Sequence, residues 1–207
     1  MEETPDDLAG HPDRLRWNEK YGNGFTASFA PHPLAVAALA LDLPDGPVAD
    51  LASGPSGSVL LAAARGRPVT AVDVSEVALA LLGREARRRG LDHLVTLVHA
   101  DLQAWRPAPG RYALVLGTGF WDPGVFAAAA AALAPRGVLG WEAFTTAARR
   151  DRPALPAAWC LGPGSPATLL PDGVSVISQE DVPGDHRGTR HRGTRRRLLA
   201  RRAAQAS

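Results

Sequence analysis

The residues best able to do chemistry lie at the ends of two short apolar segments. Segment 48–51 carries Asp50 and is followed by the small residues Ala-Ser-Gly-Pro-Ser-Gly, while segment 69–73 ends in Asp73. Acids at the ends of neighbouring strands, with a small-residue turn between them, are typical of a βαβ nucleotide site. Backbone N–H groups there contact the ligand and a carboxylate binds ribose hydroxyls. The sequence therefore predicts a ribose-containing ligand.

The turn itself narrows the choice of ligand. A pyrophosphate is bound by a glycine-rich turn at a helix N-terminus. In this chain Pro55 and Ser56 stand where two flexible glycines would serve that purpose. The turn therefore favours a ligand without phosphates.

The elements that must position these residues follow from hydrophobic periodicity and turn signals. Strands are expected at 48–51, 69–73, 93–99, 112–116, 138–144, 174–179 and 194–201. Helices are expected at 14–21, 33–43, 56–65, 75–90 and 125–133, with Ser75 as an N-cap. Alternating strands and helices predict a parallel sheet with helices on both faces, whose strand-end loops share one edge. The last two strands are closely spaced, which predicts a final antiparallel pair.

Length and composition set the class of protein. A chain of 207 residues with 45% hydrophobic and 21% charged residues fits one ordinary globular domain. No apolar run approaches the roughly 20 residues that span a bilayer, and the acidic N-terminus does not resemble a secretory signal. We therefore expect a cytoplasmic protein. Cys160 is the only cysteine, so the chain has no internal disulfide, and no spacing predicts a metal site.

The basic residues are almost all arginine. Lys20 is the only lysine among 23 basic residues, and eight arginines lie between positions 187 and 202. Such a cluster can neutralise phosphates and bind nucleic acid. The whole chain is rich in Ala, Gly, Pro and Arg, however, so we interpret the cluster as a solvated basic strand and tail. We do not expect a nucleic-acid partner.

Five short motifs together resemble a known family. They are Trp-Asn-Glu-Lys-Tyr at 17–21, Asp-Leu-Ala-Ser-Gly-Pro-Ser at 50–56, Ala-Val-Asp-Val-Ser at 71–75, Ala-Asp-Leu at 100–102, and Ala-Pro-Arg-Gly-Val-Leu at 134–139 followed by Glu-Ala-Phe at 142–144. Their order resembles class I S-adenosylmethionine-dependent methyltransferases over nearly the whole chain, and small members of the tellurite-resistance type are the nearest likeness. The resemblance implies an α/β fold with a doubly wound, Rossmann-like, seven-stranded sheet. The implied strand order is 3-2-1-4-5-7-6, with strand seven antiparallel and helices on both faces.

The resemblance also implies S-adenosyl-L-methionine as cofactor and a role for each strand-end acid. Asp50 lies near the methionine end, Gly54 gives backbone contacts, Asp73 binds the ribose hydroxyls, and Asp101 with Leu102 reads the adenine edge. The full set of implied cofactor-binding residues is Trp17, Tyr21, Asp50, Ala52, Gly54, Ser56, Asp73, Val74, Asp101, Leu102, Gly117 and Thr118.

The expected organisation is a single methyltransferase domain at 13–203, preceded by a flexible N-terminus at 1–12. Within the domain, residues 13–46 are expected to form a helical lid and residues 145–171 a loop on the acceptor side. The protein is expected to be a monomer or a homodimer.

The acceptor side is less defined by sequence. Methyl transfer from a sulfonium is an in-line displacement, so positioning and desolvation suffice unless the acceptor must lose a proton. We expect a small-molecule acceptor with a thiol, chalcogen, hydroxyl or amine group. Trp121, in the loop after the fourth strand, is a candidate wall of the acceptor pocket. Glu142, near the end of the fifth strand, is the candidate base or acceptor-orienting residue.

Two other readings of the same architecture stay open. The first is an enzyme that uses a nicotinamide or another nucleotide, against which the turn at 55–56 counts. The second is a non-catalytic protein that binds S-adenosylmethionine, or that holds RNA through its arginine-rich end.

Overall fold

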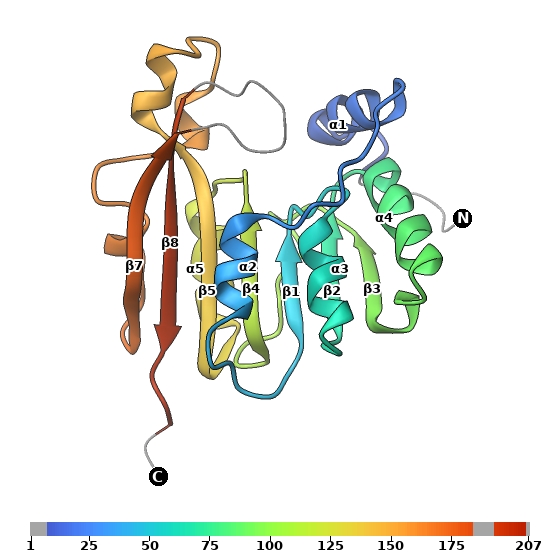
Figure 1. The fold of residues 1–207 in the computed structure, drawn as a ribbon. Helices are drawn as coiled ribbons and strands as arrows, with labels where there is room; N and C mark the ends of the chain where they lie inside the picture. The colour runs from blue at the N-terminus through green and yellow to red at the C-terminus, as the bar shows by residue number, and fades with distance from the viewer. Residues whose placement is uncertain (1–7, 184–192, 206–207) are drawn as a thin grey trace.

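The computed structural model describes residues 8–183 and 193–205. Its sheet has the strand order β3-β2-β1-β4-β5-β8-β7 (Figure 1). The strands are β1 (Val48–Leu51), β2 (Val69–Asp73), β3 (Val95–His99), β4 (Tyr112–Thr118), β5 (Leu133–Thr145), β6 (Cys160–Leu161), β7 (Val174–Pro183) and β8 (Thr194–Arg202). The first five are parallel, and β8 runs antiparallel between β5 and β7.

This topology confirms the predicted α/β fold. The predicted sixth and seventh strands are β7 and β8, because a two-residue strand, β6, pairs with β5 off the main path and adds one to the numbering. The bounds of β1 and β2 are those expected from the sequence, whereas β5 begins at Leu133, where the end of a helix was expected. The flexible N-terminus predicted for residues 1–12 falls mostly outside the described residues.

Helices cover both faces of the sheet (Figure 1). They are α1 (Pro12–Gly22), α2 (Pro33–Leu39), α3 (Gly57–Ala64), α4 (Glu76–Arg88) and α5 (Pro123–Ala131), with short 3-10 turns at Asp92–Leu94, Thr146–Arg150, Ala157–Trp159 and Ala167–Leu169. One core packs α2, α3 and α4 against the sheet, and the other packs α5 against the opposite face. In the part of the chain described, the helices are too short or too polar to cross a bilayer.

Side-chain caps fix where the helices begin. Ser75 accepts a hydrogen bond from the Ala78 N–H at the start of α4, as predicted, and Asp122 accepts one from the Val125 N–H at the start of α5. Proline occupies the first turn of α1, α2 and α5, where its missing N–H would have no partner within the helix. These starts lie at or near the carboxyl ends of the parallel strands, so the caps also position the loops at that edge.

The segment between α1 and α2 crosses directly over the first turn of α3. A Cβ atom on Gly57 would lie 2.4 Å from the carbonyl oxygen of Phe29 and 2.6 Å from the backbone of Ala30. Those atoms belong to backbone that cannot swing aside as a flexible side chain would. Glycine at 57 therefore allows the segment to pass close to α3 on its way from α1 to α2.

We predict that Gly57→Ala lowers the free energy of unfolding by about 1 to 3 kcal/mol, as overpacked sites usually do. Urea denaturation measures the loss. Gly162→Ala is the matched control, since nothing lies within 4 Å of the added methyl group. It should change stability by no more than about 0.5 kcal/mol. Equal effects of the two substitutions would contradict the close crossing.

Candidate active site

The loop after β1 is tied to its strand by a serine and an aspartate. Asp50 is buried in β1, and its Oδ2 accepts a hydrogen bond of 2.6 Å from the Ser56 hydroxyl. The same hydroxyl oxygen accepts the N–H groups of Ser58 and Val59 and so caps α3. Ser56 therefore holds the loop, at a position where the resembled family has a second glycine.

The turn of this loop has left-handed backbone. Ala52 has φ +50° and Gly54 has φ +56°. The Gly54 N–H donates a 2.7 Å hydrogen bond to Oδ2 of Asp73. A Cβ on Gly54 would lie 3.0 Å from the hydroxyl oxygen of Tyr21, so this ring of α1 lies directly beside the loop. Glycine is favoured here both by the backbone conformation and by the close approach of Tyr21.

Asp73 joins the loops that follow β1 and β2. Its side chain accepts the Gly54 N–H on Oδ2 and the Ser75 N–H on Oδ1, at 2.7 Å and 2.8 Å, and the residue is 7% exposed. Burial raises the pKa of Asp73 above its usual range, and the N–H groups of Ser75 and Gly54 oppose that rise. Val74, the next residue, presents its carbonyl oxygen 3.1 Å from Nε2 of His99 at the end of β3.

Asp101 and Leu102 follow β3 at the same edge. Oδ1 of Asp101 accepts the Gln103 N–H at 2.9 Å, and Oδ2 lies 3.7 Å from Nε2 of His11. Leu102 is buried in the core on the α5 side of the sheet. The pair therefore offers one partly exposed carboxylate and one apolar side chain next to each other, which suits the polar edge and the flat face of a base.

Helix α1 lies above the carboxyl ends of β1, β2 and β3 (Figure 1). The Ser75 hydroxyl donates a 2.7 Å hydrogen bond to Oδ1 of Asn18 in this helix. The guanidinium of Arg14 forms an ion pair with Glu76 at the start of α4, with Nε 2.9 Å from Oε2. The rings of Trp17 and Tyr21 stack with centroids 5.7 Å apart. Two predicted cofactor-binding aromatics thus share the helix that covers the acidic edge.

The carboxyl end of β4 lies between this edge and the acceptor side. Thr118 pairs with Glu142 of β5, and Gly117 lies against Trp141, whose ring would be 2.6 Å from an added Cβ. Gly117 is therefore required by packing. Trp121 is 8% exposed and its ring centroid lies 5.5 Å from that of Phe126. The structure places this predicted pocket wall in core contact with α5.

Glu142 is fully buried and surrounded by cations. Its Oε1 lies 3.0 Å from Nη1 of Arg195 and 3.3 Å from Nε2 of His32, and its Oε2 lies 2.7 Å from Nε of Arg197. Nδ1 of His32 accepts the Leu34 N–H at 3.1 Å, so the ring proton lies on Nε2 and points to the carboxylate. One histidine and two guanidiniums therefore share one buried carboxylate.

This environment decides what Glu142 can do. Burial by itself would raise the pKa of Glu142, but the hydrogen bond and charge of His32, the hydrogen bond from Arg197 and the charge of Arg195 lower it to about 2. A general base works best when its pKa lies near the working pH. Glu142 is therefore better suited to hold the arginines than to accept a proton.

The arginine partners are functional candidates that the sequence analysis missed. Arg195 and Arg197 stand two residues apart in β8, so they share one face of the strand. Their register with β5 brings them beside Glu142. The two-residue spacing of these arginines can be seen in the sequence. The pairing of β8 with β5, which places them beside Glu142, cannot.

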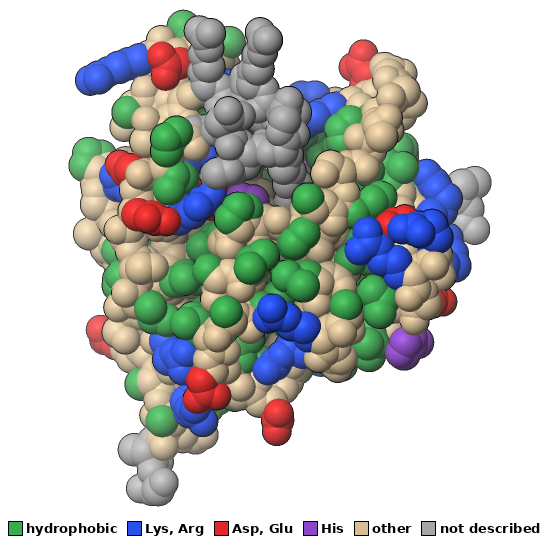
Figure 2. Space-filling model, viewed as in Figure 1, with side chains coloured by type: hydrophobic (Ala, Val, Ile, Leu, Met, Phe, Trp, Pro, Cys, Tyr) green, Lys and Arg blue, Asp and Glu red, His purple; other side chains and the backbone are tan. Residues whose placement is uncertain are grey.

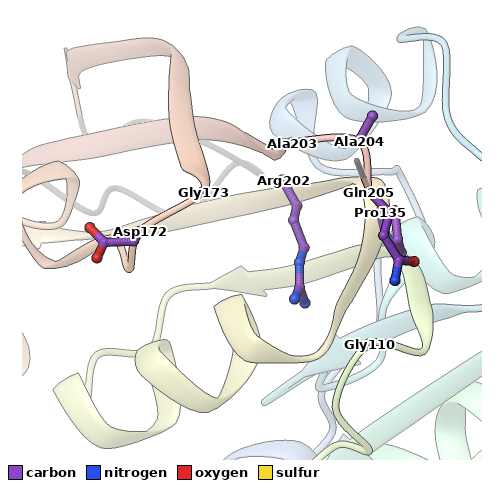
Figure 3. Close-up of a pocket in the computed structure, with 8 residues that line it drawn as sticks. All are labelled: Gly110, Pro135, Asp172, Gly173, Arg202, Ala203, Ala204 and Gln205. Atoms are coloured by element: carbon purple, nitrogen blue, oxygen red, sulfur yellow. The ribbon is translucent and has the colours of Figure 1, made fainter. Parts of the chain in front are cut away.

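A cavity of about 390 Å³ lies elsewhere, at the opposite end of the sheet (Figure 3). Its lining comes from residues just before β4 and β7, from the start of β5, and from the end of β8 and the residues after it, namely Gly110, Pro135, Asp172, Gly173, Arg202, Ala203, Ala204 and Gln205. It is therefore separate from the acidic edge. In residues 8–183 and 193–205, no three His, Cys, Asp or Glu side chains gather as a metal site would require.

Comparison with known proteins finds one match to a protein-family model. Residues 48–137 match the family model of a methyltransferase domain. This stretch runs from β1 into β5 and contains Asp50, Asp73 and Asp101. The match spans less than half of the chain, and it shows that residues 48–137 are similar to a methyltransferase domain, a class of enzyme that uses S-adenosyl-L-methionine as cofactor. No curated protein matches the chain at a significant level.

Several solved structures share the fold. The geranyl diphosphate C-methyltransferase from Streptomyces coelicolor A3(2), in complex with Mg²⁺, geranyl diphosphate and S-adenosyl-L-homocysteine, is 14% identical, with a TM-score of 0.66 over 97% of this chain and 90% of that one. The CcbJ methyltransferase from Streptomyces caelestis is 17% identical, with a TM-score of 0.62 over 90% and 96% of the two chains. A structure that concerns conversion of a disulfide bond into a thioacetal group during echinomycin biosynthesis is 19% identical, with a TM-score of 0.68 over 94% and 92%. At these identities the likeness is one of fold.

We predict that Glu142→Gln lowers the free energy of unfolding near neutral pH by about 3 to 5 kcal/mol, because it removes the charge shared by two largely buried guanidiniums. The folded-state pKa of about 2 lies below the ordinary value of 4.5. The stabilisation is therefore present above 4.5 and is lost as the pH falls toward 2. Urea denaturation at about pH 7, 5 and 3 should show the difference between the two proteins shrinking on acidification.

Asp172→Asn, at an exposed turn before β7, is the control. It should alter stability by less than about 0.5 kcal/mol at each pH. A difference between wild type and Glu142→Gln that stayed constant from neutral to acid pH would contradict the ionised state of Glu142.

Proposed function

We propose that the protein transfers a methyl group from S-adenosyl-L-methionine to a small-molecule acceptor. The observation that carries this proposal is the Asp73 carboxylate, held by the Gly54 and Ser75 N–H groups at the end of β2 inside the matched methyltransferase domain. A strand-end carboxylate beside a small-residue loop is the arrangement that binds ribose hydroxyls.

The residues at this edge fit the parts of the cofactor. Asp73 would accept the ribose hydroxyls, and Asp101 with Leu102 would contact the adenine. The left-handed turn with Gly54 would give backbone contacts to the amino-acid end, and the aromatic side chains of α1 would lie beside the cofactor. Asp50 acts through Ser56, because its carboxylate is hydrogen-bonded to that hydroxyl.

When bound, the cofactor supplies a methyl group that is already activated by its sulfonium. The chain's own task is then to exclude water and to orient the acceptor. The first part of the segment after β5, with the 3-10 turns at Thr146–Arg150 and Ala157–Trp159, lies above the carboxyl end of that strand (Figure 1). We propose that the acceptor binds between this segment and the loop after β4.

The ionised state of Glu142 limits the kinds of nucleophile that the acceptor can carry. Because Arg195 and Arg197 hold the candidate base in its ionised form with a pKa of about 2, removal of a proton from a weakly acidic hydroxyl is not favoured there. A thiolate or chalcogen anion needs no strong base. We propose that class of nucleophile first, in keeping with the resemblance to the tellurite-resistance type, with hydroxyl and amine acceptors behind it.

The distribution of charge does not favour RNA as the ligand. Figure 2 shows the basic side chains of one face spread among acidic and hydrophobic ones rather than gathered in one field. In the described part of β8, Arg195 and Arg197 pair with Glu142, and Arg196 pairs with Asp181. The arginines at 187, 190 and 192 lie outside the described residues.

We predict that S-adenosyl-L-methionine and its demethylated product bind in calorimetry and that NAD does not. Transfer of labelled methyl should then appear with at least one member of a panel of thiols, phenols, amines and chalcogen oxyanions. Binding of NAD alone would overturn the proposed function. Retention of RNA on a filter, with the steep salt dependence of phosphate binding, would instead favour the RNA alternative.

We predict that Asp73→Asn weakens binding of S-adenosyl-L-methionine by about 1.5 to 3 kcal/mol, since a charge-assisted hydrogen bond to the ribose becomes a neutral one. The amide keeps one oxygen that can accept a backbone N–H, so the fold should persist in circular dichroism. Asp92→Asn is the control, at the opposite end of β3 and exposed. Wild-type affinity in Asp73→Asn would remove Asp73 from the cofactor site.

A further inference from the structure

Two guanidinium groups contact one aromatic ring on the acceptor side. Cζ of Arg195 lies 4.1 Å from the ring centroid of Phe144, and Cζ of Arg152 lies 4.7 Å from the same centroid. Phe144 is near the end of β5, Arg195 is in β8, and Arg152 follows the 3-10 turn at Thr146–Arg150. Two guanidiniums from separate parts of the fold therefore lie within 5 Å of the same ring at the carboxyl end of β5.

Arg195 also borders the loop after β4. A Cβ on Gly119 would lie 3.8 Å from Nη1 of Arg195, and the Gly119 N–H donates a 2.7 Å hydrogen bond to the Glu142 carbonyl. Gly119 directly follows Thr118, the last residue of β4. One of the two guanidiniums thus lies beside the loop at which we propose that the acceptor binds.

Glu142 fixes this guanidinium in place. Nη1 of Arg195 is 3.0 Å from the carboxylate, and the Arg195 side chain is 14% exposed. Arg197 lies 2.7 Å from the other carboxylate oxygen, and Nε2 of His32 lies 3.3 Å from the oxygen that Arg195 contacts. Arg152, in contrast, is half-buried and stands on the acceptor-side segment rather than in the sheet.

We propose that Arg152 and Arg195 bind an anionic oxygen group, a carboxylate or a phosphate, carried by the methyl acceptor. The planar fork of a guanidinium matches two oxygens of either group, which a lysine cannot do. Both forks lie against Phe144, and Glu142 is a positioning residue for Arg195. This inference rests on the proposed function. It adds a charged group that the acceptor carries besides its nucleophile.

Matched acceptors test the proposal. Each thiol or phenol is offered as a carboxylate, as a phosphate ester and as a neutral methyl ester, for example 3-mercaptopropionate and methyl 3-mercaptopropionate. We expect kcat/KM for one of the charged forms to exceed that for the neutral form by about tenfold or more, as a charged hydrogen bond allows. The carboxylate and phosphate arms show which anion is the natural one. Equal rates for charged and neutral forms would overturn the proposal.

Variants test whether Arg152 causes the preference for charged acceptors. Arg152→Gln should lose most of the preference for the charged form, so that the ratio of kcat/KM for the charged form to that for the neutral form falls toward one. Arg150→Gln is the matched control, an exposed arginine of the same segment with no ring contact to Phe144, and it should keep the preference. Arg152→Lys, which keeps the charge but not the fork, should keep part of it. A preference that survives Arg152→Gln in full would also overturn the assignment.

A binding measurement separates this proposal from the proposed function. The protein is first titrated with S-adenosyl-L-homocysteine, and the saturated protein is then titrated with 4-hydroxybenzoate and with methyl 4-hydroxybenzoate. Tighter binding of the acid, lost in Arg152→Gln, supports the anion site even where neither compound is methylated. No binding of the homocysteine compound would overturn the proposed function. Normal binding of it, with equal affinity for acid and ester, would overturn only the anion site.

Discussion

The Asp73 carboxylate is the constraint on which the cofactor half of the molecule depends. A buried carboxylate must find hydrogen-bond donors, and this one finds the N–H groups of Gly54 and Ser75, which belong to the loops after β1 and β2. Gly54 presents its N–H from a left-handed turn that lies against Tyr21. One acid therefore fixes two loops at one sheet edge, and the fold delivers Asp101 to the same edge from β3.

The acceptor half is organised around a second buried carboxylate, with a different result. Glu142 joins the start of α2 through His32 to β5 and β8 through two arginines. Its burial would be costly without those partners. Because they hold it ionised, it serves as an anchor for cations. The two halves thus use a carboxylate in different ways: Asp73 gathers backbone donors at the proposed cofactor site, whereas Glu142 gathers guanidiniums.

The elements around Asp73 could be predicted from the sequence better than those around Glu142, and the reason is physical. The strands 48–51 and 69–73 are short apolar runs that contain or end in an acid, and both have the predicted bounds. Ser75 was readable as a cap because its role is local. The partners of Glu142 were not readable, because Arg195 lies 53 residues away and reaches it only through the register of β8 on β5. Trp121, likewise, owes its core position to a packing contact with Phe126 rather than to any local signal.

Helix α1 physically connects the two halves. Its Tyr21 lies beside Gly54 of the cofactor loop, and the guanidinium of Arg16, one turn earlier, lies 4.4 Å from the ring centroid of Trp159 in the acceptor-side segment. The helix itself has no buried residue among those described, so it is held by surface contacts rather than by the core. Elements held in this way open at a lower free-energy cost than core strands. We propose that opening of α1 uncovers the loop after β1 and releases its contact with Trp159 in a single motion, and that its closure desolvates both halves together.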